Sequence, residues 1–322
     1  MKTQILSSVH DIATAATLLE QGQLVAVPTE TVYGLAADAR NPQAVAGIFR
    51  AKGRPADHPL IVHVGNAADI KDWALDIPPQ AWQLAAAFWP GPLTMLLHKA
   101  AHVSDVVTGG LTTVGLRVPA HPVMQQLLRE HQLAVAAPSA NLYKKLSPTS
   151  VEQVLAGLDG KIAAVIDGGD CDVGLESTIV DLTGPEVQVL RAGPISAEEI
   201  SLVLGCDVSM PREHNVAVPG NVKAHYQPSK PLSIFNTAEL ASRLSHAPAD
   251  VICLYLSPVF QSMAKPSWQQ MPEQKADYAR ALYRSLFEAD KRAGSEIWLE
   301  QPPQLPAWAD VNDRLRRAQH KG

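Results

Sequence analysis

Short apolar runs alternate with amphipathic stretches along the first 205 residues of the chain. Each short run is bounded by glycine, proline or polar residues, which is typical of buried strands. The longer stretches repeat apolar residues at helical spacing, and together the two patterns predict an α/β fold. The predicted strands are Leu24–Val27, Leu60–Val64, Leu93–Leu97, Thr113–Val118, Leu133–Ala136, Ile162–Ile166, Ser177–Leu182 and Val187–Leu190.

Capping residues mark the ends of several predicted helices. Asn41 and Pro42 take the N-cap and first helical positions of one stretch, and Gly53 ends it. The N-terminal segment is also predicted to be helical, with Gly22 as its terminator. Capping boxes are expected at Ser8 with Asp11, Thr149 with Glu152, and Ser196 with Glu199. The other predicted helices of this part are Pro42–Lys52, Gln80–Phe88, Pro122–Glu130, Ser150–Leu158 and Ala197–Leu204.

Two features predict a mixed first sheet followed by a second domain. The turn Thr183-Gly184-Pro185 separates the last two strands of the first part, which indicates an antiparallel hairpin. Residues 206–230 contain three prolines and little periodicity, as expected of a linker. The predicted organisation is therefore a domain over residues 1–205, a linker over 206–230 and a second domain over 231–322.

The C-terminal part has a regular β-α-β-α-β-α pattern. Strands separated by helices imply right-handed crossovers, so we expect a small parallel, Rossmann-like sheet. Its predicted strands are Leu232–Phe235, Val251–Leu256 and Glu296–Leu299, and its predicted helices are Ala238–Ser245, Gln274–Ala293 and Ala307–Arg317.

Composition narrows the class of protein. Hydrophobic residues make up 46% of the 322 positions and charged residues 18%, which suits two globular cores. The net charge of −5 indicates neither a nucleic-acid nor a membrane partner. Three widely spaced cysteines indicate free thiols, and no apolar segment approaches the length of a membrane span. We therefore expect a cytoplasmic protein.

The usual short motifs of nucleotide and hydrolytic chemistry are absent from the sequence. It contains no G-x-x-x-x-G-K-[ST], no G-x-S-x-G and no H-E-x-x-H, and the C-terminal part has no G-x-G-x-x-G after its first strand. Any nucleotide site must therefore be built from side chains that are scattered along the sequence. No metal site of the protein's own is predicted.

The strand Thr113–Val118 carries the clearest candidate chemistry. Side chains alternate along a strand, so Thr113, Gly115 and Arg117 share one face. The glycine leaves room for an anion, and the guanidinium can bind carboxylate or phosphate. The pattern alone leaves a second interpretation open, in which Arg117 is simply solvated on an edge strand.

Other polar residues lie where strands or helices end. Arg50, Lys52 and Arg54 cluster at a helix C-terminus, which basic residues favour in any case. His63 lies within a strand, where a lone histidine is usually structural. The loop PSAN, residues 138–141, follows a strand at the end where α/β sheets bind ligands, although turns use the same residue types.

Several segments together resemble one known family. PTETVYGL, KGRPADHPL, WPGPLT and GLESTIVD occur in order, and AHYQPSKPL follows in the linker. They resemble the YrdC-type threonylcarbamoyl-AMP synthases, specifically the longer members with a second C-terminal domain. The resemblance runs from about residue 10 to residue 195, plus the linker segment.

The resemblance implies a fold and an activity. The fold is a twisted α/β sheet around a concave cavity, followed by a small Rossmann-like domain. The activity joins L-threonine, bicarbonate and ATP, with Mg²⁺, into L-threonylcarbamoyladenylate and pyrophosphate. The product is passed to the machinery that forms threonylcarbamoyladenosine in tRNA, so no tight binding of nucleic acid by this chain is expected.

The resemblance also implies which residues form the site. Lys52 and Arg54 are the expected catalytic residues, beside the phosphates of ATP. The expected threonine contacts are Thr31, His63, Arg117, Ala137 and Ser177. The expected ATP contacts are Arg54, His58, Thr113, Ser139, Asn141, Ser147, Arg191 and the linker residue Tyr226.

This sequence departs from the family pattern at two places. His58 stands where the family often has asparagine, and its charge is expected to vary near pH 6–7. Tyr143 and Lys144 stand where the family often has serine and glycine.

Three other functions compete with the synthase activity. An RNA-binding module predicts a basic patch, which the net charge of −5 argues against. A carbamoyl transferase of the related type carries cysteine-rich zinc segments, and these are missing here. A dinucleotide enzyme requires the glycine fingerprint that the C-terminal part lacks.

Overall fold

The computed structural model describes residues 2–211, 214, 216–220, 224–248 and 250–319. The chain forms two compact units. The first comprises Met1–Tyr143, Pro148–Asp172 and Glu176–Asn221. The second comprises Lys144–Ser147, Val173–Leu175 and Val222–Gly322.

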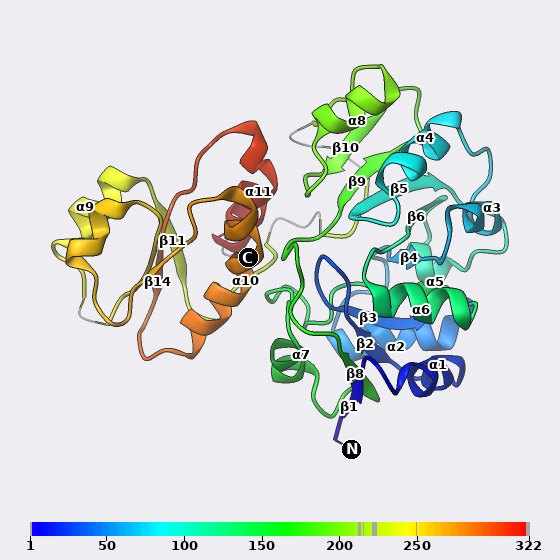
Figure 1. Ribbon diagram of the computed structural model, residues 1–322, viewed down its shortest axis with the longest axis horizontal. Coiled ribbons are helices and arrows are strands. Elements are labelled where there is room, and N and C mark those ends of the chain that lie inside the picture. Colours follow the sequence, from blue (N-terminus) through cyan, green and yellow to red (C-terminus); the bar gives the residue numbers. More distant parts are fainter. Residues whose placement is uncertain (1, 212–213, 215, 221–223, 249, 320–322) are drawn as a thin grey trace. The chain divides into compact units, whose positions relative to one another are not determined.

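The first unit is built on a mixed sheet that contains ten strands in the described residues (Figure 1). Its order is β1-β8-β2-β3-β7-β4-β6-β5-β9-β10, with both parallel and antiparallel neighbours. The strands are β1 (Gln4–Ser7), β2 (Val25–Val27), β3 (Gly34–Asp38), β4 (Ile61–His63), β5 (Leu93–His98), β6 (Thr113–Arg117), β7 (Val135–Ala136), β8 (Ala164–Asp167), β9 (Thr178–Asp181) and β10 (Gln188–Arg191).

Most helices of the first unit cover one face of this sheet. The larger apolar core lies between that face and helices α2, α3, α4, α5, α7 and α8. The helices of the unit are α1 (Ile12–Glu20), α2 (Pro42–Lys52), η1 (Ala67–Asp69), α3 (Ile70–Trp73), α4 (Pro79–Phe88), α5 (Asp105–Thr108), α6 (Pro122–Glu130), α7 (Val151–Leu158) and α8 (Ala197–Leu204).

The opposite face of the sheet is divided into two halves. Helices α1 and α6 pack over β1, β8, β2, β3 and β7 through a second apolar core. Over the other half, Ile61, Leu96, Ile179 and Leu190 form a small cluster that Val218 covers from residues 216–220. The site residues predicted on β4, β6 and β10 lie on this second half, as described below.

The second unit contains a smaller sheet that is entirely parallel in the described residues (Figure 1). Its order is β11-β14-β12-β13. The elements are β11 (Leu232–Phe235), α9 (Thr237–Leu244), β12 (Ile252–Tyr255), η2 (Pro258–Met263), β13 (Gln269–Gln270), α10 (Lys275–Lys291), β14 (Ile297–Glu300), η3 (Pro306–Trp308) and α11 (Ala309–Gln319). The prediction of a mixed sheet followed by a small parallel sheet is confirmed.

Three strands were not predicted from the sequence. Strand β3 reads Gly-Leu-Ala-Ala-Asp, and these residues have weak strand propensity. It forms because Leu35, Ala36 and Ala37 are all fully buried between neighbouring strands and the layers on both faces. Among the residues that the structure describes, strand β1 pairs only with the distant β8, and the two-residue β13 pairs only with β12, so neither has a local signal.

The predicted start of the first helix was wrong. Gln4–Ser7 is a strand, and the helix begins after Asp11, whose carboxylate accepts the Ser7 N–H at 2.8 Å. The predicted box at Thr149 is displaced by one residue, because the Ser150 side chain caps α7. The Ser196–Glu199 box, the Asn41 N-cap and the Gly53 terminator are confirmed.

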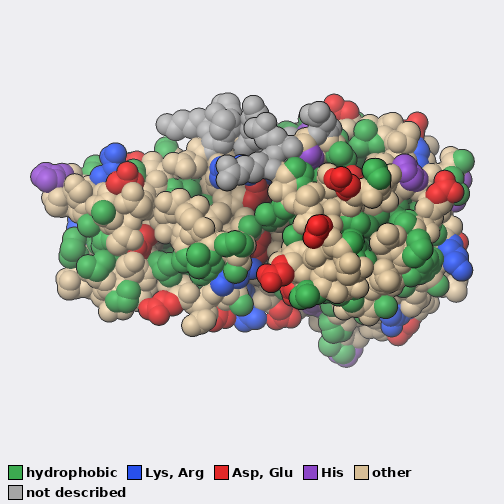
Figure 2. All heavy atoms as spheres, turned by 90° about the horizontal axis from the view of Figure 1, so that it is seen from above, with side chains coloured by type: hydrophobic (Ala, Val, Ile, Leu, Met, Phe, Trp, Pro, Cys, Tyr) green, Lys and Arg blue, Asp and Glu red, His purple; other side chains and the backbone are tan. Residues whose placement is uncertain are grey.

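Charge is interspersed over the surface that Figure 2 displays. Among the described side chains there, Lys and Arg lie in small groups separated by Asp and Glu. A nucleic-acid interface requires a continuous basic surface, and the displayed face does not have one. In the described ranges, no helix is both long and apolar enough to span a bilayer.

Candidate active site

Strands β4 and β6 bring two predicted residues side by side. The strands are parallel, with His63 paired to Arg117 and Ile61 paired to Gly115. His63 and Arg117 therefore project from the same face at the carboxyl ends of adjacent strands. Thr113 lies on this face at the opposite end of β6. The predicted alternation is confirmed, and the site residues of β6 span the length of the strand.

The guanidinium of Arg117 is buried and held on three sides. Its Nε donates to the Gly91 carbonyl at 3.2 Å, and its Nη1 donates to the Thr31 hydroxyl at 3.0 Å. Its Nη2 lies 2.6 Å from Oε1 of Glu30. Arg117 is 4% exposed, and β6 lies between β4 and β5. The alternative of a solvated arginine on an edge strand was therefore wrong.

A tight turn before β3 holds the partners of Arg117 in place. The hydroxyls of Thr29 and Thr31 lie 2.9 Å apart, and the Thr29 hydroxyl also donates to the Val32 carbonyl at 2.6 Å. Oε2 of Glu30 accepts the Ala120 N–H at 3.0 Å. The motif PTETVYGL thus supplies a rigid hydroxyl and a rigid carboxylate to the same guanidinium.

His63 is a neutral side chain in this site. It is 3% exposed, and burial lowers its pKa to about 3, with a further contribution from the Arg117 charge. A neutral imidazole offers one donor and one acceptor nitrogen. His63 can therefore orient a substrate by hydrogen bonding, but it adds no positive charge to the site at neutral pH.

A second buried guanidinium adjoins the first. Arg191 donates through Nε and Nη2 to the Ser177 carbonyl, at 3.0 and 2.8 Å, and through Nη2 to the Ser177 hydroxyl at 3.0 Å. The Ser177 hydroxyl lies 2.8 Å from that of Thr94. Thr94 precedes Met95, which pairs with Leu116 on β6. The Arg191 group and the Arg117 group are therefore neighbours on one face of the sheet.

Lys52 fastens the loop that follows β7. Its Nζ donates to the carbonyls of Ser139 and Asn141, the latter at 2.6 Å. Lys52 is 3% exposed, and burial lowers its pKa, as does the nearby charge of Arg54. Ser139 also forms a bridge with Gly34 at the start of β3. The predicted ATP-site residues Lys52, Ser139 and Asn141 therefore form a single group, in which Lys52 and Asn141 are buried and Ser139 is half-buried.

Arg54, His58 and Thr113 gather at the amino ends of β4 and β6. Nη2 of Arg54 donates to the Pro59 carbonyl at 3.0 Å. The register of the two strands places Pro59 beside Thr113. Burial, and to a lesser extent the Arg54 charge, lower the pKa of His58 from its ordinary value, which favours the neutral ring.

The two departures from the family pattern touch one another. The rings of His58 and Tyr143 meet edge to face, with centroids 5.6 Å apart. Lys144 adopts φ +66°, the left-handed region that glycine favours, although no glycine stands there. The changes at positions 58 and 143 therefore form one packing unit.

We expect His58→Asn and Tyr143→Ser to be coupled in the free energy of unfolding. An edge-to-face ring pair contributes about 0.5–1.5 kcal/mol beyond its buried area, and either substitution removes it. A double-mutant cycle by denaturant unfolding measures this coupling. His58→Asn combined with the exposed, distant Glu198→Gln is the control pair and should be additive. Additive values for the first pair would contradict the contact.

Three further predicted residues have different surroundings. Ala137 donates its N–H to the Ile61 carbonyl at 3.1 Å, which places it beside β4 and near His63. Ser147 is fully buried and belongs to the second unit. Tyr226 is 2% exposed in the second unit, where it stacks on Tyr283 at 5.7 Å. The proposed nucleotide contacts of Ser147 and Tyr226 remain predictions.

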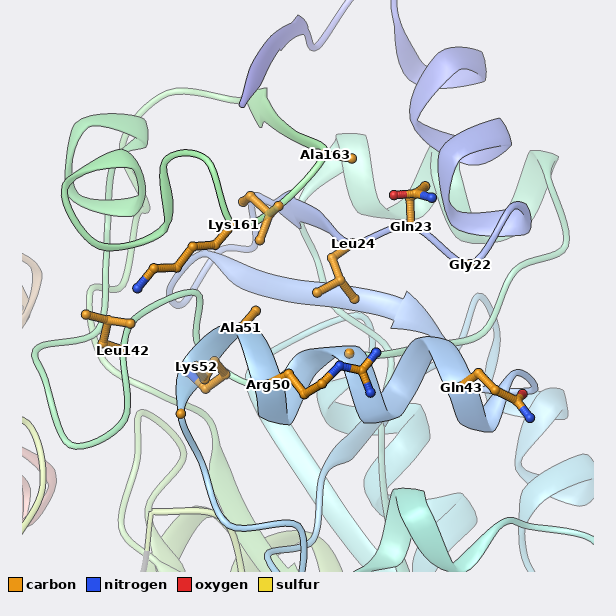
Figure 3. A pocket seen from close by; sticks show the side chains of 13 residues that line it. Gly22, Gln23, Leu24, Gln43, Arg50, Ala51, Lys52, Leu142, Lys161 and Ala163 are labelled. Carbon is orange, nitrogen blue, oxygen red and sulfur yellow. The ribbon is translucent and has the colours of Figure 1, made fainter. Parts of the chain in front are cut away.

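A cavity of about 630 Å³ beside α2 adjoins this site at Lys52 (Figure 3). Arg50, Lys52 and Lys161 contribute to its lining, and Lys52 is its only predicted site residue among the described ones. Figure 3 shows that Arg50 and Lys52 leave the helix in different directions. Arg50 is therefore not part of the group formed by Lys52, Ser139 and Asn141.

Sequence reasoning missed three groups that complete the site. Glu30 contacts Arg117, Thr94 contacts Ser177, and the carbonyl of Gly91 accepts from Arg117. All three lie within the segments PTETVYGL and WPGPLT, so the motifs marked the correct stretches of chain. Alternation along β5 shows which residues share a face with Thr94, but not which face carries the site. That becomes clear only when the pairing of β5 with β6 and β9 is known.

The fold and site define an α/β protein with two buried guanidinium groups on one face of its sheet. Two guanidinium groups and several hydroxyls share one face of the sheet, and the buried Lys52 side chain fastens the adjoining loop. Such a site suits the positioning of phosphate and carboxylate groups.

Family comparisons identify the chain. The family model Sua5_yciO_yrdC, described as "Telomere recombination", matches residues 17–193. The model described as "Threonylcarbamoyl-AMP synthase, C-terminal domain" matches residues 195–319. The chain belongs to the Sua5/YciO/YrdC family, in its long form with this C-terminal domain.

The similar curated proteins are named threonylcarbamoyl-AMP synthases. The chain is 46% identical over 223 residues to the threonylcarbamoyl-AMP synthase of Pyrococcus abyssi and 45% identical over 228 residues to that of Bacillus subtilis. These alignments cover 68% and 69% of this chain and 66% of each relative. The crystal structure of P. abyssi Sua5 complexed with L-threonine superimposes with a TM-score of 0.89 at 35% identity, covering 98% of both chains.

Proposed function

We propose that this protein is an L-threonylcarbamoyladenylate synthase. L-Threonine, bicarbonate and ATP give threonylcarbamoyl-AMP, pyrophosphate and water. Names of relatives support the activity, and the L-threonine complex of the P. abyssi protein supports the amino acid substrate. The product serves the formation of threonylcarbamoyladenosine in tRNA, carried out by a separate transfer machinery.

One observation carries this proposal most strongly. The buried guanidinium groups of Arg117 and Arg191 occupy adjacent parts of one sheet face, and Arg191 is bonded through Ser177 to Thr94 on the strand next to β6. The reaction must bring two anions together, a carbamate and a triphosphate, against their mutual repulsion. Fixed positive charges in a dry site reduce that repulsion without reorganising during the reaction.

The proposed mechanism relies on positioning. Arg117, Thr31 and His63 bind threonine, whose amine forms a carbamate with bicarbonate. A carbamate oxygen then attacks the α-phosphorus of ATP, and the bond to pyrophosphate breaks. Arg54 and Arg191 offset the charge of the phosphates, and Lys52 holds the Ser139–Asn141 loop beside them. The chain itself provides no covalent nucleophile in this scheme.

Mg²⁺ enters this scheme as part of the MgATP substrate. The residues assigned to ATP are cations and neutral donors, which suit phosphate oxygens, whereas Mg²⁺ prefers carboxylates and waters. No group of three or more His, Cys, Asp or Glu side chains in the described ranges could hold a metal ion. When bound, the ion would offset charge on the phosphates.

The cytoplasmic location is also part of the proposal. Cys171, Cys206 and Cys253 are free thiols, which agrees with a reducing compartment.

Pyrophosphate release tests the proposed activity. We expect the purified protein to release pyrophosphate from ATP only when both L-threonine and bicarbonate are present. Omitting either one should reduce release to the background rate. Release that persists without threonine, or that requires carbamoyl phosphate, would contradict the proposal.

A further inference from the structure

Arg117 and two residues beside it each have one buried polar atom that forms no geometrically aligned hydrogen bond within the described residues. These atoms are Nη2 of Arg117, Oε1 of Glu30 and Nδ1 of His63. Their residues are 4%, 7% and 3% exposed. Arg117 Nη2 and Glu30 Oε1 lie 2.6 Å apart, but they do not form an aligned hydrogen bond. Buried polar atoms are nearly always paired, so this cluster requires an explanation.

The remaining atoms of the same side chains are firmly held. Arg117 is anchored through Nε and Nη1, and Glu30 is anchored through Oε2, which accepts the Ala120 N–H. Nη2 of Arg117 and Oε1 of Glu30 are therefore fixed in position, and their only mutual contact is an ion pair without an aligned hydrogen bond. Of the three atoms, one is a cationic donor, one is an anionic acceptor and one is a neutral imidazole nitrogen. A ligand that completes this set must present a carboxylate, a cationic donor and a small polar group.

We propose that Glu30 binds the α-amino group of L-threonine and selects amino acids over hydroxy acids. This assignment rests on the proposed function and adds a residue to its threonine site. An α-amino acid carries its carboxylate and ammonium on one carbon, which matches the adjacent Arg117 and Glu30. The threonine hydroxyl then faces His63.

The chemistry of the amine agrees with this assignment. The ammonium donates to Glu30 in a charge-assisted hydrogen bond. The carbamate nitrogen retains one N–H, so the same contact persists after carbamate formation. If Glu30 served only to neutralise Arg117, it would not need an oxygen without a hydrogen-bond partner. The attraction between the two charges does not depend on hydrogen-bond alignment.

Binding of two ligands to the full chain tests the assignment. The ligands are L-threonine and the 2,3-dihydroxybutanoate of matching configuration, in which a hydroxyl replaces the amine. Titration calorimetry without ATP or bicarbonate gives both dissociation constants and the preference of the wild type for threonine. Glu30→Gln should weaken threonine binding about 10- to 100-fold, the range for a hydrogen bond to a charged group, and should change hydroxy-acid binding little.

Equal weakening of both ligands would overturn the assignment, because a merely structural Glu30 affects them alike. Asp181→Asn is the matched control. Asp181 is a 7% exposed carboxylate whose β9 pairing places it on the same face, but it accepts from Thr183 instead of contacting Arg117. The preference for threonine should survive this substitution. If it fell as far as in Glu30→Gln, the assignment would also be overturned.

Glu30→Asp keeps the test decisive if Glu30→Gln does not fold. The shorter side chain retains a negative charge near Arg117 but withdraws it from the amine, so the preference for threonine should fall while hydroxy-acid binding is kept. An unchanged preference would overturn the assignment while leaving the synthase proposal intact. Failure of the folded wild type to bind threonine would instead overturn both.

Discussion

Replacing Arg117 with alanine should lower kcat/KM for threonine by about 10³-fold and destabilise the fold by about 3–5 kcal/mol. The substitution removes the donors to Gly91 and Thr31 and the proposed partner of the substrate carboxylate. It also leaves Glu30 as a buried charge without its cation. Pyrophosphate release measures the first effect, and denaturant unfolding measures the second.

A double substitution separates these two effects. Glu30→Gln added to Arg117→Ala removes the uncompensated carboxylate, so part of the lost stability should return. Activity should not return, because the cation that binds the substrate carboxylate is still absent. If the double variant were as unstable as the sum of the two single variants, the Glu30–Arg117 pair would not be coupled and this account of the site would be wrong.

Alanine at Lys52 or at Arg54 should lower the turnover number by about 10²–10³, the scale of losing one electrostatic donor. Arg54 acts in our proposal as a direct contact of the phosphates. Lys52 also fastens the carbonyls of Ser139 and Asn141, so its loss additionally releases the loop. Pyrophosphate release at saturating threonine and bicarbonate is the measurement.

Arg50→Ala is the matched control for these variants. Arg50 lies on the same helix turn as Lys52, but its side chain is exposed and leaves the helix in a different direction, into the cavity beside α2 (Figure 3). Its removal should leave turnover close to that of the wild type. Near wild-type turnover in both Lys52→Ala and Arg54→Ala would remove the assignment of these residues to the phosphates.

Strand alternation revealed part of the site because it is a local property. The period of two placed Thr113, Gly115 and Arg117 on one face before any neighbour of β6 was known. It could not settle whether Arg117 is solvated, because that depends on β4 and β5 flanking β6. Those pairings join residues 15 to 54 positions apart, beyond the reach of a local pattern.

The partners of the site residues were hidden for the same reason. Glu30 reaches Arg117 across 87 positions of sequence, and Thr94 reaches Ser177 across 83. Sequence alone showed His58 and Tyr143 as two unrelated departures from the family pattern. The structure shows their rings in contact, which makes them one feature.

Element boundaries failed where tertiary packing replaced local propensity. The helices Pro122–Glu130 and Ala197–Leu204 were predicted with their observed bounds because proline or a capping box fixes their starts. Strand β3 is rich in alanine and is stabilised only by burial on both faces of the sheet. Strand propensity is assigned residue by residue, so it does not include the effect of that burial.

The central claim is that cations on one sheet face bring a threonine carbamate against the α-phosphate of ATP. Mass spectrometry of the products formed from ATP, L-threonine and ¹³C-bicarbonate tests it directly. We predict threonylcarbamoyl-AMP that carries the ¹³C label, formed with L-threonine in preference to other amino acids. Hydrolysis of ATP without a labelled adenylate would contradict the claim.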